Sequence, residues 1–138
     1  MKWSKVKKVM MSLEMKLLCW SVVLTMVQVV IAATGATMKV GMPALAGNRE
    51  GLPPIDGWAG RAIRAHRNML ENLVLFASLV LVAQIAGKTG ATTALGAQLF
   101  FWARVAYAPI YLAGIPWLRT GAYLVSTVGL VLILLQLL

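Results

Sequence analysis

The sequence has little charge, one cysteine and one histidine. Charged residues make up 12% of its 138 residues, and a soluble domain would carry roughly twice that fraction. The lone Cys19 cannot form a disulfide within the chain, and one thiol is too few for a cysteine metal site. His66 has only Glu71 nearby, five residues on, which is off the i, i+4 spacing of a helical ligand pair. We therefore expect no bound metal.

Motifs for nucleotide chemistry and for serine hydrolysis are also missing. The chain contains no G-x-G-x-x-G fingerprint, no Walker sequence and no Ser/His/Asp pattern. Its formal net charge of +9 also occurs in nucleic-acid-binding proteins. Here, however, most lysines lie in the N-terminal region, and the arginines lie in or beside apolar segments. The expected partners are membrane lipid and an anionic ligand, and no nucleic acid.

Long apolar segments dominate the chain. Hydrophobic residues account for 60% of it, and its mean hydropathy is +0.81. Because a helix of about 20 apolar residues crosses a bilayer, the sequence predicts an all-α membrane protein with a four-transmembrane-helix bundle. The predicted spans are residues 17–38, 60–86, 91–112 and 117–138. The glycine- and proline-rich stretch between the first two is the one substantial loop. The expected localisation is that of an integral multi-pass membrane protein.

A basic tail, residues 1–16, precedes the predicted four-helix membrane domain, residues 17–138. The tail holds five lysines against one acid, Glu14, and we expect it to lie among lipid headgroups outside the first span. The following uncharged run is longer than a typical signal-peptide core, so it is predicted to be a spanning helix. A later start would remove most of the tail's charge, and the candidate residues are Met10, Met11 and Met15.

One stretch, RAIRAHRNMLEN at residues 61–72, places polar chemistry within the second predicted span. Four of its residues follow helical steps of three, four and three and therefore share one face: Arg61, Arg64, Asn68 and Glu71. In the third predicted helix, Arg104 is followed at the same spacing by Tyr107 and Tyr111. A charge inside a span costs roughly 3 kcal/mol. Arg104 therefore needs a partner, and Glu71 is the only acid predicted within a span.

The arginines in the second, third and fourth predicted helices outnumber the acidic residues that could pair with them. Glu71 can form a structural ion pair with Arg104, but it cannot also neutralise the remaining arginines: Arg61, Arg64, Arg67 and Arg119. The surplus positive charge predicts an anionic ligand held by planar guanidinium groups. Tyr107 and Tyr111 are compatible both with helix packing and with a place in that site.

These residues carry a resemblance to a known family. RAIRAHRNMLEN, then ARVAYAPIY about thirty residues on, then LRT at the start of the last helix, resemble the MAPEG family. Its members are membrane-associated proteins in eicosanoid and glutathione metabolism, such as microsomal glutathione transferases, leukotriene C4 synthase and microsomal prostaglandin E synthase. The resemblance covers about residues 58–125. It implies a homotrimer of four-helix subunits that binds glutathione between neighbouring subunits, with a lipid-facing crevice for a lipophilic small-molecule substrate.

The resemblance also implies roles for individual residues. Arg64, Asn68 and Glu71 would hold the carboxylates and amino group of glutathione, the co-substrate. Further residues would lie near or line the same site: His66, Arg67, Tyr107 and Tyr111. Arg104 would lie beneath it, and Arg119 would be the catalytic residue beside the thiol. Residue 72 is asparagine where the leukotriene branch has tyrosine, so a dedicated leukotriene synthase is not expected.

Three functional classes follow. The first is a glutathione transferase or peroxidase that acts on lipophilic electrophiles or lipid hydroperoxides. The second is a non-catalytic protein that binds glutathione or lipid at the same site. The third is a small multidrug exporter, a class that also has four short spans and a membrane glutamate. Glu14 would have to supply that first-helix acid, and its predicted position outside the span disfavours this class.

Overall fold

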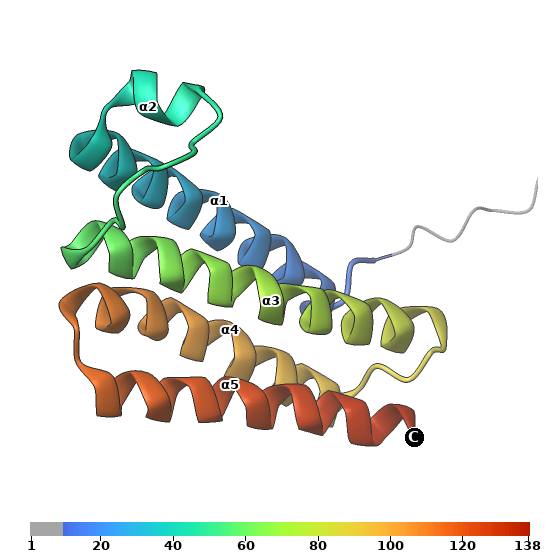
Figure 1. Cartoon of the computed structure of the whole chain (residues 1–138). Helices are drawn as coiled ribbons and strands as arrows, with labels where there is room; N and C mark the ends of the chain where they lie inside the picture. Colours follow the sequence, from blue (N-terminus) through green and yellow to red (C-terminus); the bar gives the residue numbers. More distant parts are fainter. Residues whose placement is uncertain (1–9) are drawn as a thin grey trace, which may run out of the picture.

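The computed structural model describes residues 10–138, so residues 1–9 of the predicted basic tail lie outside the described part. The described chain is all-α, as predicted. Figure 1 shows the long helices running side by side, with a short helix set apart beside the C-terminal end of the first. The five helices are α1 (Leu13–Val40), α2 (Met42–Ala46), α3 (Gly57–Ile85), α4 (Ala91–Ala113) and α5 (Pro116–Leu137).

Three of these helices, α1, α3 and α5, are long and apolar enough to cross a membrane. The protein is therefore an integral multi-pass membrane protein. Helix α4 has 23 residues and is also of spanning length, but polar residues such as Gln98 and Arg104 interrupt its apolar sequence. It is not among the helices that length and composition alone identify as spans.

The first helix begins earlier than the predicted start at residue 17. Ser12 caps it, because its side-chain oxygen accepts a hydrogen bond of 3.3 Å from the backbone N–H of Met15. The helix therefore includes Glu14, whose side chain is only 3% exposed. The Thr93 hydroxyl donates to the Glu14 carboxylate across 2.5 Å. The prediction that Glu14 lies outside the first helix is wrong, because α1 begins at Leu13 and the Glu14 carboxylate contacts Thr93 at the start of α4.

Helix pairs in the bundle meet through small residues. The largest contacts are between α4 and α5 and between α1 and α3, and α3 and α1 both also contact α4. A Cβ atom on Gly96 of α4 would lie 2.6 Å from the backbone oxygen of Gly129 of α5. Because glycine has no Cβ atom, the two backbones can approach closely here, as they do at small residues in membrane helix pairs. Beside it, the rings of Phe76 and Phe100 stack with centroids 4.1 Å apart.

Gly129→Val should separate α4 from α5. A Cβ at this position would lie 2.8 Å from the backbone nitrogen of Phe100, and overpacking of this kind costs about 1–3 kcal/mol of the free energy of unfolding. We expect a lower thermal unfolding midpoint, followed by circular dichroism in detergent micelles. Gly121→Val is the matched control on the same helix, because a Cβ added there would meet no atom within 4 Å. Equal midpoints for the two variants would contradict close backbone packing at Gly129.

Candidate functional site

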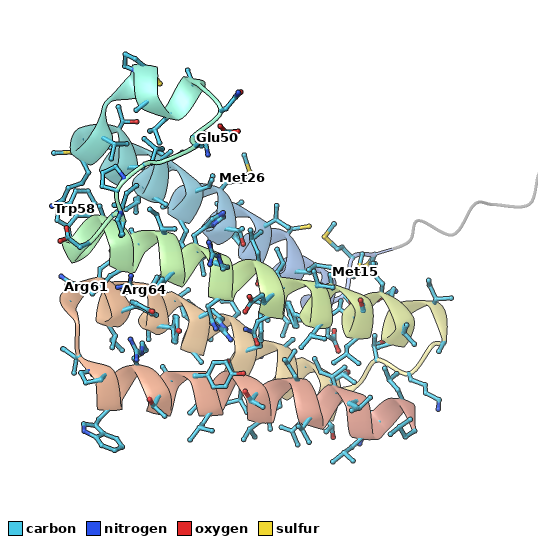
Figure 2. The ribbon with its side chains drawn as sticks, in the orientation of Figure 1. Met15, Met26, Glu50, Trp58, Arg61 and Arg64 are labelled. Carbon is cyan, nitrogen blue, oxygen red and sulfur yellow. The ribbon has the colours of Figure 1, made fainter. Side chains whose placement is uncertain are left out.

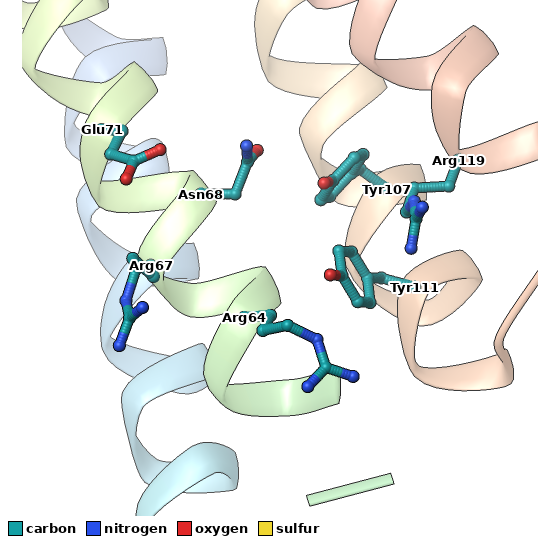
Figure 3. A pocket seen from close by; sticks show the side chains of 7 residues that line it. All are labelled: Arg64, Arg67, Asn68, Glu71, Tyr107, Tyr111 and Arg119. Carbon is teal, nitrogen blue, oxygen red and sulfur yellow. The ribbon is translucent and has the colours of Figure 1, made fainter. Parts of the chain in front are cut away.

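A polar groove lies between α3 and the α4–α5 pair. Its cavity has a volume of about 260 Å³. Seven of the nine site residues predicted from the sequence line it (Figure 3). They are Arg64, Arg67, Asn68 and Glu71 of α3, Tyr107 and Tyr111 of α4, and Arg119 of α5. Three helices that are separate in the sequence therefore contribute to one site.

Helical periodicity explains why these side chains meet. Arg64, Asn68 and Glu71 repeat at steps of four and three along α3, which is the spacing of one helix face. Tyr107 and Tyr111, four residues apart on α4, repeat in the same way. Figure 3 shows both tyrosine hydroxyls directed toward α3 across the groove. Their rings pack edge to face, with centroids 5.6 Å apart.

The turn between α4 and α5 brings Arg119 to the groove. Gly114 ends α4 with a left-handed backbone, φ 76°, and Pro116 begins α5. Arg119 therefore lies in the first turn of α5. Its guanidinium carbon lies 4.5 Å from the centroid of the Tyr111 ring. This cation–π contact orients the planar guanidinium beside the cavity.

The charges around the groove do not neutralise each other. Arg64, Arg67 and Arg119 supply three positive charges and Glu71 one negative charge, which leaves a net charge of +2. Within residues 10–138 the only ion pair closer than 4 Å joins Lys39 to Asp56. Glu71 is therefore free to accept a cationic group, while the guanidinium groups can bind anions. The groove suits a small ligand that carries several negative charges and one positive charge.

Arg104 lies beneath the groove and is only 1% exposed. Its Nη1 donates a hydrogen bond of 2.6 Å to the side-chain oxygen of Asn68. Its Nε and Nη2 are buried and have no hydrogen-bond partner among the described residues. Instead, three aromatic rings surround the guanidinium, with centroids 5.0 to 5.6 Å from its carbon: Phe100, Tyr107 and Tyr123.

The prediction that Glu71 neutralises Arg104 is therefore wrong. Glu71 is exposed at the groove, where its carboxylate keeps its solvation, and burial beside Arg104 would cost the desolvation of a second charge. The neutral amide of Asn68 takes the place opposite Arg104 instead. Because its oxygen accepts from Arg104, the Asn68 amide nitrogen is left as a donor for the groove. Tyr123 was not predicted as part of this site, although it follows Arg119 by one helical turn.

Three polar residues of the RAIRAHRNMLEN stretch lie outside the groove lining: Arg61, His66 and Asn72. Asn72 is buried, and its side-chain amide donates a hydrogen bond of 2.8 Å to the backbone oxygen of Asn68. The Nε of Arg61 donates a hydrogen bond of 2.9 Å to the backbone oxygen of Leu112, near the end of α4. Arg61 therefore satisfies a helix-terminal carbonyl. His66 is partly buried, does not line the cavity, and its Nδ1 has no hydrogen-bond partner among residues 10–138. The same residues contain no cluster of three or more metal-ligating side chains.

The chain was compared with models of known protein families. The family model described as the MAPEG family matches residues 17–138. The matched region includes every residue that lines the groove, together with Arg104 beneath it. Neither the curated proteins nor the solved structures give a match to this chain.

Proposed function

The chain belongs to the MAPEG family, and from this premise we propose that it is a glutathione-dependent membrane transferase or peroxidase. Its substrates would be lipophilic electrophiles or lipid hydroperoxides that reach it from the bilayer. The proposed architecture is a homotrimer in which α4 also crosses the membrane, so that each subunit has four spans. Membership of a membrane family connected with glutathione and lipid mediators is consistent with this activity.

The observation that carries the proposal is the charge pattern of the groove. Glutathione in its thiolate form has two carboxylates, one ammonium group and one thiolate, and its net charge of about −2 complements the groove's +2. In the proposed complex, Arg64 and Arg67 bind the carboxylates by charge-assisted hydrogen bonds. Glu71 accepts the ammonium group. The free amide nitrogen of Asn68 donates to a peptide or carboxylate oxygen.

Arg119 is the proposed catalytic residue. A thiol of the cysteine type titrates near about 8.5 and is mostly protonated at neutral pH. A guanidinium beside it favours the nucleophilic thiolate. The thiolate then attacks an electrophilic carbon, forming a C–S bond while the leaving group departs with its electron pair. With a hydroperoxide, the thiolate attacks the terminal oxygen and breaks the O–O bond. The alcohol leaves after protonation, and a second glutathione converts the sulfenic acid to the disulfide with release of water.

Binding and turnover together test this function. Purified protein in phosphatidylcholine nanodiscs would be titrated with glutathione by calorimetry, and then assayed with a generic aryl halide and an alkyl hydroperoxide. The proposal expects saturable binding and turnover that needs glutathione. Binding without turnover of either substrate would favour the non-catalytic alternative. Absence of both would contradict the assignment of the groove.

Arg64→Ala should weaken glutathione binding by roughly tenfold or more, because charge-assisted hydrogen bonds contribute about 1.5–3 kcal/mol. Titration calorimetry measures the change. The matched control is Lys88→Ala, which also removes one positive charge but lies beyond the C-terminal end of α3, where its amine donates to the Leu137 carbonyl. An unchanged affinity in Arg64→Ala would remove this residue from the binding site.

A further inference from the structure

Arg61 lies in the first turns of α3 and does not line the groove. Figure 2 shows it at the start of α3, beside the end of α4. Its Nε donates a hydrogen bond of 2.9 Å to the backbone oxygen of Leu112. Its partly buried guanidinium also packs against the turn that follows α4, because a Cβ atom built on Gly114 would lie 3.6 Å from the guanidinium carbon. Arg61 therefore joins α3 to the end of α4.

The sequence makes the Leu112 carbonyl dependent on this hydrogen bond. In an α-helix its oxygen would accept from the backbone N–H four residues on, and that residue is Pro116, which has no N–H. The N–H groups of Gly114 and Ile115 donate to other carbonyls near the end of α4. Arg61 supplies the donor that the proline lacks, and its positive charge lies at the negative end of the α4 dipole.

The turn that Arg61 contacts is the one that brings Arg119 to the groove. The backbone N–H of Arg119 donates a hydrogen bond of 3.2 Å to the carbonyl of Ile115. The backbone N–H of Gly114 donates one of 3.0 Å to the carbonyl of Tyr111. The Tyr111 ring in turn is the surface on which the Arg119 guanidinium stacks, at 4.5 Å. Both the backbone of Arg119 and its stacking partner are therefore bonded to the turn that Arg61 holds.

We propose that Arg61 is a positioning residue, which fixes the turn between α4 and α5 and thereby holds the Arg119 guanidinium beside the thiol of bound glutathione. This inference rests on the proposed function, because it needs a thiol at Arg119. A group that stabilises a thiolate has to be held in a narrow range of positions, and a misplacement of about 1 Å can lower a rate roughly 100-fold. Arg61 therefore affects the ionisation of the thiol without contacting glutathione.

Arg61→Met tests this role, because methionine keeps a long side chain and removes both the charge and the donor. The full-length protein in phosphatidylcholine nanodiscs would be assayed with glutathione and a generic aryl halide. We expect kcat to fall roughly 10- to 100-fold, while the glutathione affinity measured by calorimetry changes by less than about threefold. Arg61→Lys keeps a charged donor for the Leu112 carbonyl, so it should recover part of kcat.

The ionisation of the glutathione thiol separates positioning from a purely structural role. It is followed by the ultraviolet absorbance of the thiolate as the pH is raised. In Arg61→Met the thiol of bound glutathione should ionise closer to its ordinary value of about 8.5, as expected for Arg119→Ala. The double variant should match Arg119→Ala alone in kcat and ionisation, because Arg61 acts only through Arg119. A parental ionisation profile in Arg61→Met, or a further loss of kcat in the double variant, would overturn the proposal.

Lys88→Met is the matched control for Arg61→Met. Lys88 also donates to a carbonyl at the end of a helix, that of Leu137 at 3.1 Å, but at the opposite end of the bundle. This control should keep the parental kcat and ionisation profile, and an equal loss in both variants would reject the positioning role. Absence of glutathione-dependent turnover in the parent protein would reject the proposed function and this role with it. A loss of kcat in Arg119→Ala without one in Arg61→Met would reject this inference alone.

Discussion

Arg119→Ala should lower glutathione-dependent turnover by roughly 100-fold or more, the loss typical when one group that stabilises a developing anion is removed. Glutathione affinity should change by less than about threefold, because Arg64 and Arg67 hold the carboxylates in the proposed complex. The stacking of the Arg119 guanidinium on Tyr111, at 4.5 Å, gives it a fixed position. Arg119→Lys keeps the charge but loses the planar stacking group, so its turnover should be intermediate.

The dependence of turnover on pH distinguishes stabilisation of the thiolate from a structural role. A nearby cation lowers the pKa of the glutathione thiol, so the parent protein should hold thiolate at neutral pH. Without Arg119 the thiol should ionise closer to its ordinary value of about 8.5. The difference in turnover between Arg119→Ala and the parent protein should therefore shrink as the pH rises toward about 9, where the glutathione thiol ionises without a neighbouring cation.

Trp117→Ala is the matched control for Arg119, since Trp117 is exposed in the same first turn of α5 and does not line the groove. It should keep parental turnover and an unchanged pH profile. Parental turnover in Arg119→Ala, with glutathione binding also unchanged, would exclude the catalytic role. A turnover loss that is the same at every pH would indicate that Arg119 only supports the local structure.

Helical periodicity made much of the groove predictable. Side chains three and four residues apart on α3 must share a face, and the same holds for Tyr107 and Tyr111 on α4. A polar face in an apolar helix also has to turn toward other protein or a polar ligand. The sequence therefore identified most of the lining before the relative placement of the helices was known.

Contacts between helices were less predictable, because they depend on rotation and register that a single helix pattern does not determine. Arg104 could pair with either polar residue on the facing side of α3, and it contacts Asn68 instead of Glu71. Glu14 was misplaced for a different reason. The sequence did indicate a helix start before Glu14, because Ser12 is a favourable N-cap residue. However, the partner of the Glu14 carboxylate, Thr93, is distant in the sequence and contacts it only because α1 packs on α4.

Arg104→Met should weaken glutathione binding by about tenfold or more without lowering the stability of the ligand-free protein. Arg104 is buried with two unpartnered nitrogens among the described residues, and replacing such a charge by an apolar side chain of similar length is often neutral or stabilising. The loss should appear only when glutathione binds, because Arg104 holds the Asn68 side-chain oxygen and so leaves the amide nitrogen as the donor for the ligand. Thermal unfolding with and without glutathione measures both effects.

A double-mutant cycle shows whether Arg104 acts through Asn68. Asn68→Ala removes the proposed donor itself and should weaken binding by a similar factor. If Arg104 only orients this amide, the double variant should bind no more weakly than the weaker-binding single variant, because the two side chains act as one unit. Additive losses would mean that Arg104 reaches the ligand independently of Asn68. A lower unfolding midpoint for ligand-free Arg104→Met would instead make the guanidinium a structural element of the bundle, satisfied by its three aromatic neighbours.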